Sequence, residues 1–397
     1  MLKTVYTFLK PFRNALLLLL IIFTACEDDD ETSELTSDSS DLEVNNYALV
    51  STGQTDAYDL DGEIVSGLSE GDELYGQDGH YQKGSSASYT DNGDGTITDN
   101  VTGLMWQQSP SSDDYTWDEA EEYCENLELA DYDDWRMPTV KELFSISDFE
   151  SGWPYFNQDY FDLTSDEISK DEQYWGNNKY VGVTVEGGDD AAFGVNHVTG
   201  HIKAYAANAT GPVGGKYVRA VRGDTYGTND FTENGDSTIT DNSTGLMWAQ
   251  YDSGEGLDWA DALAYAENSE LAGYTDWRLP NIKEMQSIAD YTRSPTATDA
   301  DNVGPALNAL FNCTQITSEA GYDDYPYYWS STSAYFSTSS PGYYYAWYYA
   351  AGRAVNDEGE DFHGAGAVRF DTKDEDGPAG EDAERYYNYV FLVRDAE

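Results

Sequence analysis

The stretch TITDNVTGLMW at residues 96–106 returns almost unchanged as TITDNSTGLMW at residues 238–248. In both, Thr-Ile-Thr alternates in the manner of a strand, Asp-Asn and Thr-Gly favour a turn, and Leu-Met-Trp is an apolar return. The pattern therefore predicts a β-hairpin. Aligning residues 89–148 with residues 231–290 without gaps gives 34 identities in 60 positions. Identity this far above chance indicates that the chain is a tandem duplication.

Two short helices are predicted behind each hairpin. The first begins at Trp117, or at Trp259 in the second copy, where apolar residues recur at helical spacing. The second follows DWRMP at residues 134–138 and DWRLP at residues 276–280, where Thr-x-x-Glu and Asn-x-x-Glu have the spacing of a capping box. Each copy then continues in Tyr-, Gly- and Ser-rich sequence that is typical of strands and long loops. A hairpin, two helices and a long-looped antiparallel sheet predict an α+β fold for each copy.

The N-terminus has the pattern of an export signal. Three cations precede an apolar run over residues 15–23, and TAC at residues 24–26 leads into acidic sequence. A cysteine directly after small residues resembles a bacterial lipobox, so Cys26 is the expected lipidation site and residues 1–26 the expected signal peptide. We therefore expect a protein of the bacterial cell envelope, attached to the outer membrane or cell surface through a lipid anchor.

Composition divides the rest of the chain. Residues 27–45, EDDDETSELTSDSSDLEVN, are acidic and serine-rich with little to bury, which predicts a disordered tether. Residues 46–88 predict short strands and turns that pack on the first copy. The two copies are expected to span residues 89–224 and 225–397.

The balance of charge limits the partners. The chain has 75 acidic and 20 basic side chains, and its formal net charge is −55. Such a surface repels nucleic acid, which excludes that class of partner. It is typical either of strong solvation or of divalent-cation binding. Beyond the anchor only Cys124 and Cys313 remain, at positions that do not match between the copies, and the sequence leaves open one disulfide or two separate thiols.

The ordered motifs resemble a known family. DNGDGTITDNVTGLMWQ, the helix at Trp117, DWRMPTVKEL and, in the second copy, LAGYTDWRLPNIKEMQSIADY and YYWSST are similar to the Lcl C-terminal domain family, first catalogued as a domain of unknown function. The similarity covers about residues 47–397 as two tandem copies. It implies a C-type-lectin-like fold on secreted or surface-attached bacterial proteins, with adhesion to glycans proposed for the best-known member. Relatives often carry a cysteine in the final strand, where this chain has Ala220 and Leu392, so their disulfide pattern is not reproduced.

Two classes of function follow from these observations. The first is a non-enzymatic, lipid-anchored surface protein whose lectin-like domains bind an extracellular ligand, either a glycan or a protein, and so mediate adhesion. The alternative is a structural envelope or matrix protein that makes protein–protein contacts. An enzyme is least favoured and no catalytic residue is predicted, because the chain lacks a nucleophile elbow, a P-loop and a paired-cysteine metal motif. His197 and His201 lie in NHVTGHIK, which predicts a hairpin and not the helical spacing of metal ligands.

Tryptophans and arginines are repeated between the copies. A ligand site need not be duplicated, whereas a core must be, so the repeated tryptophans are expected to be core residues. Arg136 and Arg278 each lie beside such a tryptophan, where an unpaired cation would be costly, so pairing with an acid or with carbonyl groups is favoured over anion binding. The tryptophans given structural roles are Trp106, Trp135, Trp248 and Trp277.

One aromatic segment has no counterpart in the first copy. PGYYYAWYYAAGR at residues 341–353 is a candidate platform on which sugar rings stack, with packing of half its side chains into a core as the alternative. The ligand-binding residues predicted here are Tyr343, Tyr345, Trp347 and Tyr349.

No cofactor is certain, and calcium is the candidate. DNGDGTITDN at residues 91–100 is not an EF-hand loop, because Thr90 and Val101 would fall at its first and twelfth positions. TDADNVG at residues 298–304 instead offers Asp299, Asp301 and Asn302 as a predicted calcium site.

Overall fold

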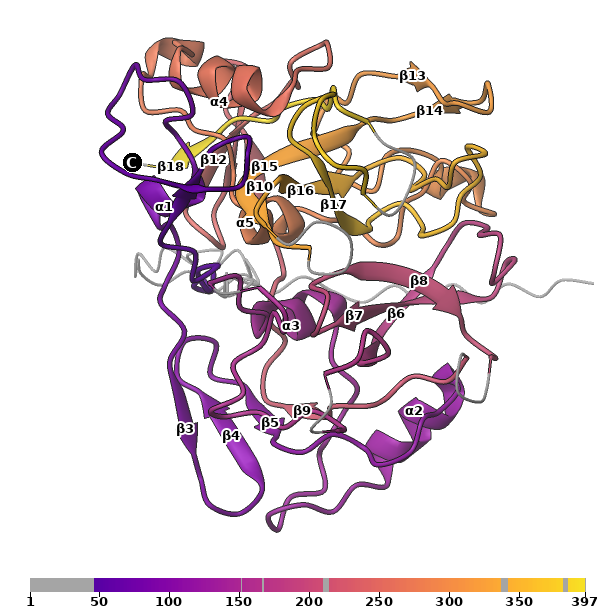
Figure 1. Ribbon diagram of the computed structural model, residues 1–397. Coiled ribbons are helices and arrows are strands. Elements are labelled where there is room, and N and C mark those ends of the chain that lie inside the picture. Colours follow the sequence, from indigo (N-terminus) through magenta and orange to yellow (C-terminus); the bar gives the residue numbers. More distant parts are fainter. Residues whose placement is uncertain are drawn as a thin grey trace, which may run out of the picture. The chain divides into compact units, whose positions relative to one another are not determined.

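The computed structural model of the protein describes residues 46–150, 152–165, 168–209, 214–336, 342–380 and 385–396. The predicted anchor at Cys26 and the predicted tether at residues 27–45 lie outside these ranges. Residues 44–397 form one compact unit. Within it, the first copy (purple to magenta in Figure 1) and the second copy (orange to yellow) lie side by side, and their strands meet in the middle.

Each copy begins with the predicted hairpin. β4 (Thr96–Asp99) pairs with β5 (Met105–Gln107), and β11 (Thr238–Asp241) pairs with β12 (Leu246–Ala249), both antiparallel. Asp99 sets the first turn, because its Oδ1 accepts the Val101 N–H at 2.9 Å and Gly103 follows with a φ of +75°. Two further strands complete a four-stranded sheet in each copy, namely β3 (Tyr89–Asp91) and β9 (Val221–Arg222) in the first, and β10 (Phe231–Glu233) and β18 (Val393–Asp395) in the second.

The predicted helices are present, and their caps explain where they begin. α2 (Trp117–Glu125) starts after Thr116, whose hydroxyl accepts the Glu119 N–H while the Glu119 carboxylate accepts the Thr116 N–H. The matching helix α4 (Trp259–Glu267) is capped by Asp258. The shorter helices α3 (Val140–Ser145) and α5 (Ile282–Ser287) both begin with the predicted capping box. Caps of this kind matter most in short helices, whose first N–H groups have no partner within the helix.

The looped parts of the two copies build one shared sheet. Its strand order is β15-β16-β17-β8-β7-β6. The central pair is antiparallel and places Val368 opposite Ile202, each the first residue of its strand. The copies are thus related by an approximate twofold axis that passes through the sheet. The strands are β6 (Gln173–Tyr180), β7 (Ala191–Asn196) and β8 (Ile202–Ala206) from the first copy, and β15 (Tyr327–Ala334), β16 (Tyr345–Ala350) and β17 (Val368–Thr372) from the second.

Helices cover both faces of the shared sheet. In β16, Tyr345, Trp347 and Tyr349 point into a central core that also contains residues of α3 and α5. The alternate residues of the same strand point into a second core together with α4, as expected from the period of two in a strand. In the first copy, α2 and the outward-facing residues of β6 and β7 form the corresponding core. The predicted α+β class is confirmed, with the two copies fused through their sheets.

The repeated tryptophans lie in these cores. Trp106 and Trp248 are 0% exposed, Trp135 is 3% exposed and Trp277 is 1% exposed. Their burial agrees with the structural role predicted from the duplication, because each copy has to build the same interior.

The segment before the first copy packs mainly on the second copy, so the prediction that it packs on the first is wrong. Its elements are β1 (Ala57–Tyr58), β2 (Ile64–Val65) and α1 (Asp78–Tyr81). The Gln54 side-chain amide exchanges hydrogen bonds of 3.0 and 2.9 Å with the backbone of Ser333 in β15. The physical reason is the edge of the sheet: β15 is an outer strand, and its free backbone groups need partners.

Smaller elements complete the second copy. They are η1 (Leu271–Gly273), η2 (Ala300–Asn302), β13 (Ile316–Thr317) and β14 (Asp323–Asp324). Cys124 and Cys313 are both free thiols, so of the two alternatives it is the separate thiols that the structure contains. Over the ranges that the structure describes, no helix has the length and apolar character needed to cross a bilayer.

Candidate functional site

The aromatic segment predicted to bind a ligand is a core strand. Tyr345, Trp347 and Tyr349 are 0% exposed, and Trp347 packs edge to face against Phe149 and Tyr155, with ring centroids 5.4 and 5.2 Å away. β16 lies between two other strands and has helices over both faces, so it presents no side chain to solvent. The predicted stacking platform is therefore wrong for these three residues.

Tyr343 lies outside that strand and is partly exposed. Its ring stacks on Tyr58 with a centroid separation of 3.8 Å and an interplanar angle of 14°. Since Tyr58 already covers one face of the ring, Tyr343 serves to hold the N-terminal segment on the second copy.

Of the predicted calcium ligands, Asp301 and Asn302 lie in η2 and Asp299 is its N-cap. Asp299 Oδ1 accepts the Asp301 N–H at 3.1 Å and so caps this short helix, while Asp301 is exposed. Within the described ranges, no group of three or more His, Cys, Asp or Glu side chains is placed to hold a metal ion. Calcium binding by Asp299, Asp301 and Asn302 stays a prediction.

Both predicted arginines pair with a glutamate six residues later. Arg278 donates two hydrogen bonds of 2.6 Å to Glu284, and each side chain is 3% exposed. Arg136 does the same to Glu142 at 2.7 Å. Each glutamate is also the capping-box residue of the following helix. The pairs therefore tie the DWR motifs to α3 and α5, in agreement with the predicted structural pairing.

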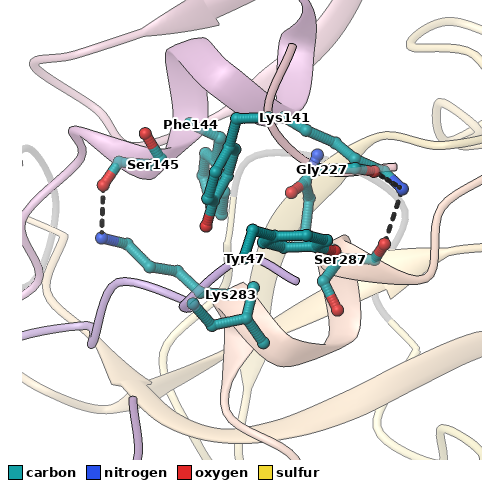
Figure 2. Close-up of a pocket in the computed structure, with 10 residues that line it drawn as sticks. Tyr47, Lys141, Phe144, Ser145, Gly227, Lys283 and Ser287 are labelled. Atoms are coloured by element: carbon teal, nitrogen blue, oxygen red, sulfur yellow. Dashed lines mark hydrogen bonds between the residues drawn. The ribbon is translucent and has the colours of Figure 1, made fainter. Parts of the chain in front are cut away.

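Two lysines, Lys283 buried and Lys141 partly buried, join the copies across the twofold axis, as Figure 2 shows. Lys141 in α3 donates to the carbonyl of Ser287 at the end of α5, at 2.6 Å, and Lys283 in α5 donates to the carbonyl of Ser145 at the end of α3, at 2.8 Å. A cation at the last carbonyl groups of a helix also complements the helix dipole. Because the same contact is made in both directions, the junction has the geometry of a symmetric dimer interface.

The space between these lysines is a structural junction. The cavity, to which Tyr47 and Phe144 contribute, has a volume of about 10 Å³, room for roughly one water molecule. Burial lowers the pKa of Lys141 and of Lys283 to about 8. Both ammonium groups are thus largely charged at neutral pH and are held by carbonyl oxygens.

A larger pocket, which we call the seam pocket, lies where β8 meets β17. Its volume is about 350 Å³, and it takes side chains from both copies. This volume is in the range typical of small-molecule sites. The lining residues are Lys170, Asp171, Gln173, Asn196, Thr199, His201, Lys203, Tyr205, Phe362, His363 and Arg369.

The charge of the seam pocket contrasts with that of the chain. Three of the 20 lysines and arginines line it, together with one acid, Asp171. Lys203 follows Ile202 and Arg369 follows Val368, so the two cations occupy equivalent positions on either side of the central strand pair. In a chain with a net charge of −55, this local gathering of cations is unusual.

Aromatic and polar groups complete the lining. Lys203 Nζ lies 4.2 Å from the ring centroid of Phe362 and 5.4 Å from that of Tyr205, and it forms a 3.1 Å ion pair with Glu186. Thr199 is 6% exposed, and its hydroxyl has no hydrogen-bond partner in the described part of the chain. A buried hydroxyl without a partner is costly, which favours a bound water or ligand group beside it.

The β7–β8 turn places the two neighbouring histidines differently. His201 lines the seam pocket, whereas His197 is fully buried and stacks on Phe156 with a centroid distance of 4.3 Å. Burial lowers the pKa of His197 well below its usual value. His197 is therefore neutral at physiological pH and acts as a packing residue.

The sequence did not single out the seam pocket or the lysine pair. The pocket residues come from residues 170–205 and 362–369, and only the pairing of β8 with β17 brings them together. Lys141 and Lys283 carried a signal, because both copies keep Lys-Glu at the same place in a chain with few cations. That signal did not show that the lysines would cross to the other copy, because a lysine on a short helix is usually exposed to solvent.

The fold is thus a duplicated α+β unit whose two copies are fused through one sheet, with a pocket at the junction. The Lcl C-terminal domain family matches residues 95–222 and 237–370, and the chain belongs to this family. Membership favours a surface or secreted protein. No curated protein and no solved structure matches the chain.

Proposed function

We propose that the protein is a non-enzymatic, lipid-anchored bacterial surface protein that binds an acidic glycan in the seam pocket and so mediates adhesion. The observation that carries this proposal is the meeting of Lys170, Lys203 and Arg369 in one pocket of a strongly acidic chain. A sugar carboxylate or sulfate complements such cations, and arginine in particular can bind it through two parallel hydrogen bonds.

The rest of the lining favours a sugar over a small inorganic anion. Tyr205 and Phe362 offer apolar faces, while Gln173, Asn196 and Thr199 offer donors and acceptors for hydroxyl groups. A pocket of about 350 Å³ has room for a sugar residue and part of its neighbour. The binding surface is thus this pocket, in place of the aromatic segment suggested by the sequence.

The net negative charge of the protein affects the rate at which an acidic sugar associates more than the affinity with which it is held. At physiological salt the Debye length is about 8 Å, so charges across the surface are largely screened from an approaching ligand. Once the acidic sugar is in the pocket, it lies among the lining cations Lys170, Lys203 and Arg369, with Asp171 as the one lining acid. We therefore expect association to be slow at low salt, where the like charges repel, and to become faster with added salt.

The location rests on the sequence and on the family. The lipobox pattern ending at Cys26 supports an anchored protein, and family membership supports a surface protein. A structural envelope protein that contacts other proteins is the second candidate, and the open groove described below favours it.

Calorimetry with the full mature chain tests the proposal. We expect an oligosaccharide containing uronate or sulfate to bind at least tenfold more tightly than its neutral counterpart, with and without calcium. Lys203→Gln and Arg369→Gln should each weaken binding at least tenfold. Lys179→Gln is the matched control, because Lys179 lies on the same sheet, outside the pocket and 45% exposed. Equal affinity for the neutral sugar, or pocket variants that bind like the parent, would refute an acidic-glycan site.

A further inference from the structure

The approximate twofold axis creates two equivalent grooves beside the lysine pair. An offset of 142 residues relates Lys141 to Lys283 and Phe149 to Tyr291. The hydrogen bonds at the two helix starts also correspond. Asn178 Oδ1 accepts the first N–H of α3 at 2.9 Å, and Thr332 Oγ1 accepts the first N–H of α5 at 3.0 Å. What fills one groove is therefore a guide to what fits the other.

One groove is filled by residues 49–54 of the chain itself, LVSTGQ, which we call the strap. The Phe149 N–H donates to the Thr52 carbonyl at 2.7 Å, and Lys283 donates to the Ser51 carbonyl at 2.9 Å. Gln54, 1% exposed, binds the N–H and the carbonyl of Ser333. The strap thus pairs with the Lys283 side chain of α5, with the backbone of the loop after α3 and with the backbone of the sheet edge.

The equivalent groove is open. It has a volume of about 410 Å³ and is lined by Lys141, Asn178, Tyr291 and their neighbours. The Tyr291 N–H occupies the position of the Phe149 N–H, and among the described residues it has no hydrogen-bond acceptor. The Gly227 N–H in the same groove is also without one. Both residues are buried, and a buried N–H group is nearly always paired.

The sheet edges of the two grooves also correspond. β6 and β15 are the outer strands of the shared sheet, and both have a register shift at the same place, between Trp175 and Lys179 and between Trp329 and Ser333. In β15 the residue after the shift is bound by Gln54 of the strap. In β6 the matching residue is Lys179, so an amide side chain in the open groove would meet the same edge geometry.

We propose that the open groove binds an extended segment of a partner protein that imitates the strap: uncharged, with a carbonyl that accepts the Tyr291 N–H and a glutamine two residues later that binds the edge of β6. This is addition of a peptide to a sheet edge. The strap carries no charge, and Asp290 lines the open groove, so an acidic segment is disfavoured. Lys141 offers no spare charge, because it already donates to Ser287, Gly227 and Asn229.

A fluorescent peptide with the sequence of residues 47–54, YALVSTGQ, is the probe, and the full mature chain is the receptor. We expect saturable binding by fluorescence anisotropy, and at least tenfold weaker binding when the glutamine of the peptide is replaced by alanine. Peptide at saturation should slow amide hydrogen exchange at Tyr291 at least tenfold and leave Phe149 unchanged, since the strap already protects Phe149.

Two matched variants locate the binding. Thr292 is exposed and lines the open groove, and Glu150 is the exposed residue at the equivalent position beside the strap. Thr292→Trp should abolish binding, whereas Glu150→Trp should leave it unchanged. The reverse result would mean that the peptide displaces the strap, and it would overturn the proposal. No binding at millimolar peptide would overturn it as well. Neither result bears on glycan binding in the seam pocket.

Discussion

Asp78 provides a sharp test of how the N-terminal segment is held. It is 2% exposed, and its Oδ2 accepts the hydroxyls of Thr52 and Thr332 at 2.8 and 2.6 Å. Its Oδ1 has no hydrogen-bond partner among the described residues. Burial, only partly offset by the two hydroxyls, raises the pKa of this carboxyl from 3.8 to about 6. The ionised form is therefore disfavoured in the folded protein.

The effect on stability follows from the sign of that change. Because the folded pKa lies above the unfolded value, the contribution of Asp78 to stability is fully present below pH 3.8 and is lost as the pH rises through about 6. A pKa moved from 3.8 to about 6 corresponds to about 3 kcal/mol. Asp78→Asn keeps an oxygen for both hydroxyls and removes the charge, so we expect it to raise the free energy of unfolding at pH 8 by about 1–3 kcal/mol.

Urea unfolding at pH 5 and pH 8 measures this quantity. The gain from Asp78→Asn should shrink at pH 5, where the parent carboxyl is largely protonated. Asp61→Asn, on the exposed part of the same segment, is the control and should change little at either pH. A variant that is less stable than the parent at pH 8 would show that the ionised carboxylate is favourable, and the account of Asp78 would be wrong.

Other predictions follow from the same structure. Trp347→Ala should lower the free energy of unfolding by about 3–5 kcal/mol, because it empties the centre of the shared core; a variant that unfolds like the parent would contradict its burial. Arg278→Ala should lower the free energy of unfolding, measured by denaturant titration, by about 3–5 kcal/mol, because it leaves the Glu284 carboxylate buried without its partner. Arg136→Ala should lower it by less, because the Arg136 side chain is 32% exposed and its pair with Glu142 is closer to solvent. Cys26→Ser should abolish labelling by a palmitate analogue, and label that persists would refute the anchor.

The parts of the fold that the sequence could predict are those encoded locally. The hairpins, the helix at Trp117 and the capping boxes each depend on residues within a few positions of one another. Because the chain is duplicated, each of these patterns occurs twice, and the second occurrence supported the prediction made from the first. The burial of Trp106 and Trp248 followed from the same duplication, because two copies need two equivalent interiors.

The relation between the copies could not be predicted in this way. Identity between two sequences shows that they fold alike, and it does not show which faces meet. The pairing of Ile202 with Val368 depends on contacts 166 positions apart, and the seam pocket exists only after that pairing. Trp347 was misassigned for the same reason: its lack of a repeat partner suggested a free surface, but its strand lies inside a sheet that both copies build.

A duplicated chain can do what a symmetric dimer cannot, because its two halves are free to differ. The lysine pair is symmetric, with each ammonium group on the other copy's helix end. The strap breaks that symmetry, since a single chain has one N-terminal segment and can fill one groove. Because only one of the two equivalent grooves has an internal occupant, the Tyr291 N–H in the other has no acceptor among the described residues. Thr292 lines the open groove and is exposed, so the groove has room for a larger side chain at this position. If the groove were only an imperfection of packing, selection for stability would be expected to fill it in this way. The Thr292→Trp variant therefore also tests whether the groove serves binding or folding. Closing the groove should raise or preserve the free energy of unfolding while it removes peptide binding. A loss of both would mean that the groove supports the fold.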